Sequence, residues 1–258
     1  MKQKNLISII VLFLFLIGSN TVMAQKPVPN QIKYDQKRLH FGFYLGGNQM
    51  LFSVKMRPGF ANFTYYQNQI PEFNADSAHL LNVTPIPQFG FTIGIVSSLT
   101  MGKYFNLRFT PELLFSERKL RYNILTYYRD KTVLIENFDK NIPSTHLNFP
   151  LYLKYKGVRL HNARPYIFVG IKLVIDLAAQ AGKVEDENER NIVVKLYRSD
   201  IAFEAGVGFD FYFNWFKMGT ELRMSYGLND VLKNENNIYT DPIDSIHSRI
   251  FQLVFTFE

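Results

Sequence analysis

The chain has 258 residues, a formal net charge of +7 and no cysteine. A sequence without cysteine excludes disulfide bonds, a lipid-anchoring cysteine, a thiolate nucleophile and cysteine-ligated metals. The mild basicity falls well short of the charge of a nucleic-acid-binding protein, so no nucleic-acid partner is expected.

The amino terminus has the pattern of a secretory signal peptide. Lys2 and Lys4 precede an apolar run over residues 6–17, and Val22-Met23-Ala24 supplies the cleavage site. The run is shorter than the roughly 20 residues that a membrane-spanning helix needs, which makes an uncleaved anchor the weaker alternative. We therefore expect export and cleavage after Ala24, which leaves 234 residues (258 − 24). The expected regions are a signal peptide (1–24), a periplasmic lead (25–38) and one β-barrel domain (39–258).

From residue 39 onward, apolar residues recur at every second position in separate segments, as in β-strands with one apolar face. In the first segment Leu39, Phe41, Phe43 and Leu45 share a face opposite small or polar residues. No run of 18 apolar residues follows Ala24, so a membrane crossing would have to use strands. The eight predicted strands cover residues 39–46, 88–97, 106–116, 146–155, 166–177, 198–213, 216–226 and 249–258.

The connections between these strands alternate between long and short. The long ones cover residues 55–85, 117–145, 178–197 and 227–248. Barrels of the outer membrane show this asymmetry, with long extracellular loops and tight periplasmic turns. Whether residues 117–145, which contain Val133-Leu134-Ile135, extend their neighbours as a hairpin stays open. Pro111 would remove a ladder hydrogen bond from the third strand, so we expect a bulge or break there.

Alternation alone also fits a soluble barrel or a sandwich. The apolar face favours a membrane, because it is rich in Phe, Leu and Ile, and because aromatic residues gather beside the short turns as in an interfacial girdle. The girdle residues are Tyr104, Phe105, Tyr155, Tyr212, Phe213, Trp215 and Phe257. The sequence therefore predicts an all-β fold, an eight-stranded antiparallel transmembrane β-barrel with four long extracellular loops and short periplasmic turns, in contact with outer-membrane lipid.

Charged residues lie on the predicted inner face. The interior of an eight-stranded barrel is only wide enough for side chains to fill it, so opposite charges there should pair and plug the lumen. A proton or ion path is the alternative. The predicted network comprises Arg108, Glu112, Asp200, Glu204, Asp210, Lys217, Glu221 and Arg223.

Basic residues gather on the predicted periplasmic side. The lead carries Lys26, Lys33, Lys37 and Arg38, and a second group, Lys154, Lys156, Arg159 and Arg164, flanks the turn after the fourth strand. One interpretation is attraction to lipid phosphates. The other is a docking surface for an acidic periplasmic partner, for which the second group is the candidate.

No pattern with catalytic or metal-binding spacing occurs. The acidic residues at 185–187 and 189 do not match a calcium loop, the five histidines are scattered, and no GxSxG motif is present. We expect no catalytic residues, no metal, no cofactor and no small-molecule substrate. An enzyme at the rim of the barrel is the remaining alternative.

Several segments together resemble the PorT family of Bacteroidetes outer-membrane barrels, which is associated with type IX secretion and, in gliding relatives, with motility. They are the Ala24-Gln25 junction, FNLRFTP at 105–111, LFSER at 114–118, HLNFPL at 146–151 and SRIFQLVFTFE at 248–258. One departure from the usual outer-membrane ending is that the last aromatic residue, Phe257, is penultimate.

This resemblance covers nearly the whole mature chain. It implies a non-enzymatic accessory role in moving folded cargo proteins across the outer membrane, with protein partners in a secretion complex, and it supplies no catalytic residues to carry over. The alternative is a surface barrel whose long loops bind external ligands or host factors independently of secretion.

Overall fold

The computed structural model describes residues 29–66, 69–70, 75–130, 132–179 and 194–258. The predicted signal peptide, Lys26 and the acidic residues at 185–189 lie outside these residues. Among the described residues no helix is long and apolar enough to cross a bilayer. The helical elements that are described are two short 3-10 turns, η1 (Tyr34–Gln36) and η2 (Phe60–Asn62).

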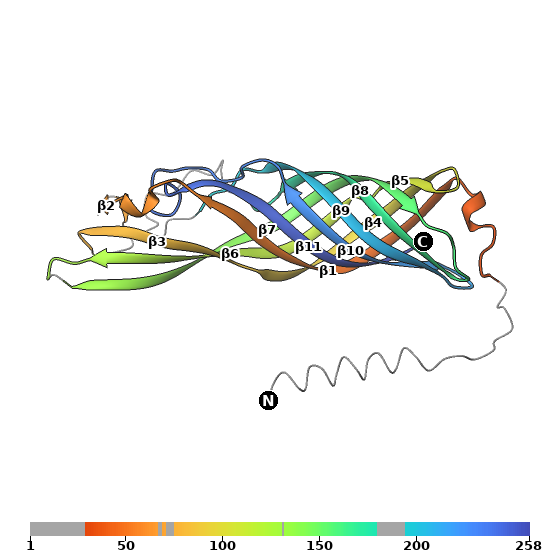
Figure 1. Ribbon diagram of the computed structural model, residues 1–258, viewed down its shortest axis with the longest axis horizontal. Coiled ribbons are helices and arrows are strands. Elements are labelled where there is room, and N and C mark those ends of the chain that lie inside the picture. Colours follow the sequence, from red (N-terminus) through yellow and green to blue (C-terminus); the bar gives the residue numbers. More distant parts are fainter. Residues whose placement is uncertain (1–28, 67–68, 71–74, 131, 180–193) are drawn as a thin grey trace, which may run out of the picture.

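The strands form one closed antiparallel ring (Figure 1). β1 closes it by pairing with β11 on one side and β4 on the other. The described strands are β1 (Leu39–Met56), β2 (Tyr65–Tyr66), β3 (Ser77–Ile86), β4 (Gln88–Met101), β5 (Phe105–Phe109), β6 (Glu112–Tyr127), β7 (Val133–Lys156), β8 (Ala163–Asp176), β9 (Ser199–Tyr212), β10 (Lys217–Gly227) and β11 (Ile243–Phe257).

Two places in the ring are built from broken strands. β5 and β6 act as one strand interrupted at Thr110-Pro111, as the proline predicts. The gap is bridged by hydrogen bonds from Ile95 N to Pro111 O (3.0 Å) and from Thr110 N to Pro150 O (3.2 Å). β3 and β4 follow one another in the same way around Pro87. If β3 with β4 and β5 with β6 each count as one strand, and the short β2 is left out, the ring has eight strands. This is the number that the sequence predicts.

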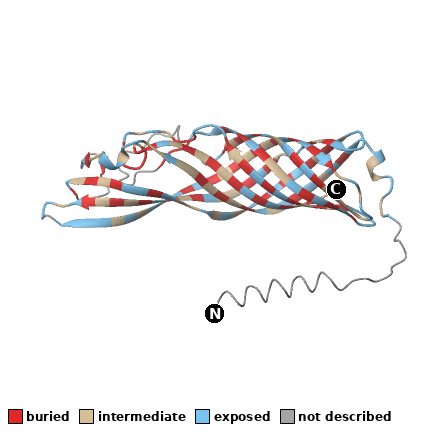
Figure 2. Ribbon diagram, in the orientation of Figure 1, coloured by how far each residue is buried: buried red, intermediate tan, exposed pale blue. Residues whose placement is uncertain are grey.

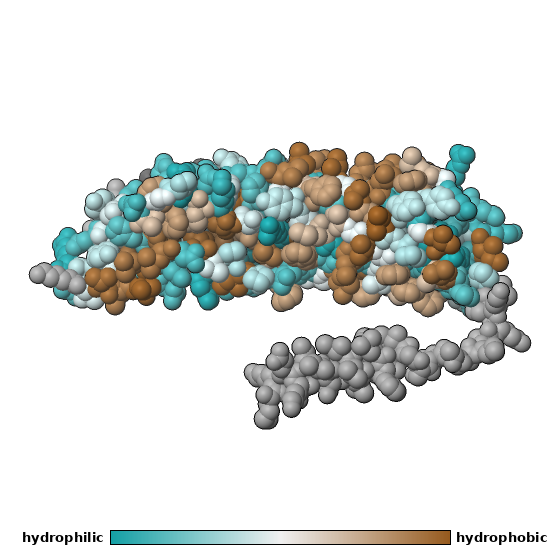
Figure 3. Space-filling view, in the orientation of Figure 1, coloured by the Kyte–Doolittle hydropathy of each residue, from teal (hydrophilic) through white to brown (hydrophobic). Residues whose placement is uncertain are grey.

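Burial alternates along the strands, which produces the chequered pattern in Figure 2. Phe41 and Phe89 point outward, with 67% and 81% of their surface exposed, whereas the polar residues Asn48 and Thr92 of the same two strands are buried inside. Figure 3 shows hydrophobic side chains over the ring of strands on the visible face. An exposed ring of Phe, Leu and Ile around a buried polar interior is the reverse of a water-soluble barrel, and it confirms the predicted direction of the two faces.

Residues 117–145 are not a loop. β6 continues to Tyr127 and β7 starts at Val133, so the two strands form a hairpin that projects past the ring, with β3 pairing along the other side of β6 (Figure 1). The predicted loop at 55–85 is likewise partly strand, since it contains β2 and β3. The sequence left the hairpin open, because polar residues interrupt the alternation between Glu117 and Thr145, and it did not predict β2 or β3.

The projecting part of the molecule, called the head below, has its own hydrophobic core. Phe52 at the end of β1, Leu120 and Tyr122 of β6, and Val231 and Tyr239 of the β10–β11 connection are all buried in one cluster. Inward positions that are polar in the ring are therefore apolar in the head. All four predicted long loops thus contribute to a folded head, and the one at 178–197 does so through Val194 and Leu196.

Candidate functional site

The candidate site is the barrel interior together with the end that carries the short turns. Every second residue of a strand points inward, so the order of strands in the ring decides which charges meet. In the order β1-β11-β10-β9-β8-β7-β5/β6-β4, β10 lies diametrically opposite the broken strand β5/β6.

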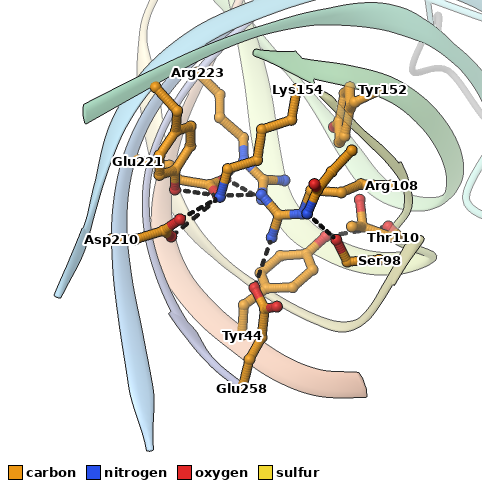
Figure 4. Close-up of polar contacts among 12 residues, drawn as sticks. Tyr44, Ser98, Arg108, Thr110, Tyr152, Lys154, Asp210, Glu221, Arg223 and Glu258 are labelled. Carbon is orange, nitrogen blue, oxygen red and sulfur yellow. Dashed lines mark hydrogen bonds and ion pairs between the residues drawn. The ribbon is translucent and has the colours of Figure 1, made fainter. Parts of the chain in front are cut away.

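Two arginine–carboxylate contacts cross the lumen between these opposite strands. Arg108 Nη1 of β5 donates to Glu221 Oε1 of β10 at 2.5 Å, and Arg223 Nη1 of β10 lies 3.8 Å from Glu112 Oε2 of β6. Arg223 also holds Glu221 through Nη2 at 2.6 Å. Figure 4 shows Arg108, Glu221 and Arg223 pointing toward one another from the surrounding wall. The network ties opposite walls together, which neighbouring-strand pairs cannot do.

Lysines complete the network. Lys172 Nζ of β8 lies 2.6 Å from Glu204 Oε2 and 3.7 Å from Glu112 Oε1. Lys154 Nζ of β7 lies 2.8 Å from Asp210 Oδ2 of β9. Lys154 is 1% exposed, so it belongs to the lumen and is not available to a partner, contrary to its predicted place in a periplasmic surface.

Inward tyrosines donate to the same carboxylates, a feature that the sequence did not reveal. Tyr44 Oη donates to Glu112 Oε2 at 2.5 Å, Tyr152 Oη to Glu204 Oε1 at 2.6 Å and Tyr166 Oη to Glu221 Oε1 at 2.7 Å. In the sequence these tyrosines lie on the polar face of the predicted strands, and that position was the only indication that they point into the lumen. A buried carboxylate needs several donors, and these phenols supply them.

Glycines make room for the tall aromatic side chains. A Cβ at Gly94 would stand 2.5 Å from the Tyr44 ring, and one at Gly206 would stand 2.3 Å from Cζ of Phe168. The interior is therefore filled by large side chains of one strand that lie over glycines of another. The small residues of the inner face are packing sites rather than channel lining.

A second charged group lies nearer the head. Arg118 Nη2 of β6 contacts Asp176 Oδ2 of β8 at 2.6 Å, and its Nη1 donates to Ser248 Oγ of β11 at 3.1 Å. Asp200, a predicted member of the central network, lies instead in this second group, where its charge interacts with that of Arg118 and its Oδ1 accepts from Asn229 N at 3.1 Å. The other seven predicted network residues are buried in the central lumen or at its short-turn end.

The lead closes the end that carries the short turns. Asp35 of η1 reaches both Arg164 Nη1 at 2.8 Å and Lys156 Nζ at 3.4 Å. Burial tends to raise the pKa of Asp35, but these two cations outweigh it and hold the pKa below its usual range. The carboxylate is therefore ionised near neutral pH and fixes the lead on the β7–β8 end of the ring.

Tyr34 carries the lead further over the mouth. Its hydroxyl donates to Glu258 Oε2 at 2.9 Å, and its ring stacks on His40 with centroids 4.0 Å apart. Burial and the charge of Glu258 raise the pKa of Tyr34, so the phenol keeps its proton. Tyr212 meets Tyr34 edge to face and is 2% exposed, so it is part of this closure and not of the predicted girdle.

The four residues of the predicted partner surface therefore have internal roles. Lys154 lies in the lumen, and Lys156 and Arg164 bind Asp35. Arg159 donates to the Asn30 carbonyl of the lead and lies over the Tyr212 ring, 3.8 Å from its centroid. Lys156, Arg159 and Arg164 form the seat of the protein's own lead, which supplies an acidic partner in Asp35.

The lumen is closed by its own side chains. Arg108, Glu112, Lys172, Glu204, Glu221 and Arg223 are each 3% exposed or less. Ionised groups that line a water-filled channel would be solvated, so these values describe a packed polar core. In the described part of the chain, no three histidine or carboxylate side chains converge on a point where they could hold a metal ion.

Comparison with known proteins identifies the fold family. Residues 23–233 match the family described as outer membrane protein beta-barrel domain. The chain belongs to this family. In an outer-membrane barrel the short turns and both termini face the periplasm, so the closed mouth is the periplasmic end and the head is extracellular.

Two solved barrels are similar to this chain in outline. Neisserial surface protein A (NspA) has 10% sequence identity and a TM-score of 0.41, covering 85% of this chain and 98% of its own. OprG from Pseudomonas aeruginosa has 12% identity and a TM-score of 0.41, covering 86% of this chain and 97% of its own. The comparison with curated proteins found no match. The family assignment rests on the matched residues and the ring of strands.

Proposed function

We propose that this outer-membrane barrel is a non-enzymatic accessory component of type IX protein secretion that acts through its two ends. The packed lumen supports action through the ends, because buried ion pairs between opposite walls leave no route for a folded cargo protein. The link to secretion is supported by the sequence segments that resemble the PorT family.

Three of those segments meet in the barrel, two from residues 105–118 and one from residues 146–151. Phe109 of the first segment pairs with Leu151 of the third, and Leu114 of the second pairs with His146. They meet around the break at Pro111, where Thr110 N donates to Pro150 O. These three segments therefore surround one structural feature, a locally interrupted wall, whereas residues 248–258 lie on β11 elsewhere in the ring.

The test is cargo secretion in a deletion strain complemented with matched variants. We expect the deletion to leave cargo in the periplasm and the wild-type gene to restore export. Asp35→Asn would release the lead from Lys156 and Arg164. A hairpin shortened by replacing residues 125–135 with Asn-Gly would remove the tip of the head and keep Ile124 paired with Glu136. A barrel carrying Lys103→Gln, which leaves both features intact, serves as the control.

Each result assigns the active end. Loss of export with Asp35→Asn at normal barrel abundance places the working surface in the periplasm, and loss with the shortened hairpin places it outside the cell. Normal export in the deletion strain would refute the role in secretion while leaving the family assignment unaffected.

A second candidate function, binding of external ligands by the head, is favoured by an open strand edge. Asp76 N donates to Tyr127 O at 2.9 Å, so the main-chain groups of Tyr127 point toward β3. Its partner on β7, Val133, must then direct its own N–H and C=O away from β6. By alternation, the main-chain groups of Ile135, Asn137, Asp139 and Asn141 point the same way.

No described strand pairs with this side of β7 before His146, where β8 begins its pairing. Ile135 beside the edge is 65% exposed and Val133 is 49% exposed. An open edge with apolar side chains is a template for an added strand.

The cysteine-free sequence gives a direct test of this edge. Asn137→Cys creates a unique thiol, which a membrane-impermeant maleimide should label in the purified barrel. Labelling on intact cells would show an edge open to external ligands, and protection only on cells would show a bound partner. Protection of the thiol in both the purified barrel and intact cells would rule out the edge as a binding surface.

A further inference from the structure

A second group of cations lies at the periplasmic mouth, separate from those that hold the lead. Lys33 and Lys37 flank η1, and both side chains are exposed. Across the described ranges, from residue 29 to residue 258 with their gaps, neither ammonium group has an ion-pair partner. This contrasts with Lys156 and Arg164, whose charges Asp35 neutralises.

These lysines open onto a surface pocket of about 500 Å³. Leu39 and Phe41, lipid-facing residues of β1 that are 54% and 67% exposed, form its apolar side. Trp215 in the β9–β10 turn borders it and is 93% exposed. Tryptophan at such a level is typical of the interface between lipid and water.

The one acidic side chain in the pocket does not oppose an incoming anion. The Glu258 side chain is 1% exposed, and it already binds Lys217 Nζ at 2.9 Å and Arg108 Nη2 at 3.5 Å. Its main-chain oxygen accepts from Lys217 N at 2.8 Å. The two lysines are therefore the charged side chains left to meet a ligand, with Asn214 and the indole beside them.

We propose that this pocket binds an anionic phospholipid of the periplasmic leaflet, with the headgroup phosphate on Lys33 and Lys37 and the acyl chains along Leu39 and Phe41. A basic rim above an apolar wall matches the two parts of a phospholipid, whereas free phosphate would use the rim alone. Because Asp35 docks the lead on the barrel, both lysines are held above the apolar side of the pocket, which Leu39 and Phe41 form. The bound lipid is a membrane contact that holds whether or not the barrel serves secretion.

Trp215 makes the site measurable, because it is the only tryptophan of the chain. The full mature barrel is placed in phosphatidylcholine nanodiscs that contain a small fraction of one lipid brominated on its acyl chains. Bromine quenches the indole only at short range. Brominated phosphatidylglycerol is compared with brominated phosphatidylcholine at the same fraction.

We expect phosphatidylglycerol to occupy the site with about 30-fold preference, the scale that two surface lysines give. The double substitution Lys33→Gln and Lys37→Gln should abolish the preference and leave quenching equal for the two lipids. Lys103→Gln removes a cation of the same rim outside the pocket and should leave the preference intact. Far-ultraviolet circular dichroism confirms that each variant is folded.

Four results would overturn the proposal. Equal quenching of the wild-type barrel by both lipids would show no headgroup preference. A preference that survives in the double variant would place the site elsewhere, and an equal loss with Lys103→Gln would show general attraction to a basic surface. Displacement of the brominated lipid by inorganic phosphate alone would show a phosphate site without a role for the acyl chains.

Discussion

Arg108 and Glu221 face each other across the barrel, with Nη1 and Oε1 2.5 Å apart, although 113 residues separate them in the chain. The pair joins β5 to the diametrically opposite strand β10, so it connects the two halves of the wall through the interior. A buried ion pair is costly to break from one side, because the remaining charge stays in a dry interior.

This geometry predicts strong coupling between the two residues. Arg108→Met or Glu221→Gln alone should lower the free energy of unfolding by about 3–5 kcal/mol each. The double variant should lose less than the sum, by about 1–3 kcal/mol, because neither charge is then left unpaired. Urea unfolding of the refolded barrel in detergent measures all four corners of the cycle, and additive losses would contradict the contact.

The packing of Tyr44 over Gly94 gives a second prediction. Gly94→Ala should lower the free energy of unfolding by about 1–3 kcal/mol, because the new methyl group would overlap the Tyr44 ring. Gly47→Ala is the matched control, since a Cβ there meets nothing within 4 Å. Similar unfolding midpoints for the two alanine variants would argue against this packing.

Docking of the lead should depend on pH through Asp35. Its pKa in the folded protein is depressed, so its contribution is complete above the ordinary Asp pKa of about 3.9 and is lost as the pH falls through the lower folded value. Because the lead and Trp215 border the same pocket, indole fluorescence should report a transition below about pH 3.9.

Asp35→Asn separates this transition from the titration of other carboxylates. The variant should lack the transition and should resemble the acid form of the wild type already at neutral pH. If the transition remained unchanged in Asp35→Asn, the lead would be held by groups other than this ion pair.

The sequence predicts the ring well, because lipid outside and a polar lumen inside force a period of two on every strand. The break at Pro111 followed from one residue, since proline lacks the ladder donor. Seven of the eight predicted network residues gather in the lumen for the same reason. The interior of an eight-stranded barrel is so narrow that inward side chains must contact one another.

Which charged side chains pair with one another could not be predicted from the sequence, because the pairing depends on the order of strands in the ring and not on spacing along the chain. Lys154 was predicted as part of the basic group, although alternation also puts it on the polar face of its strand, and its 2.8 Å contact with Asp210 places it in the lumen. Likewise the single acid in the lead, Asp35, turns Lys156 and Arg164 from a surface into an internal seat. The head escaped prediction because its inward face is apolar, which reverses the pattern of the ring.

The most direct measurement is single-channel conductance of the purified barrel in a planar lipid bilayer, with a general diffusion porin as the positive control. The buried Arg108–Glu221 and Lys172–Glu204 pairs predict insertion without a steady open level. A stable ohmic conductance that persists from one insertion to the next would mean that ions pass through the lumen, and it would contradict a barrel that works only through its ends.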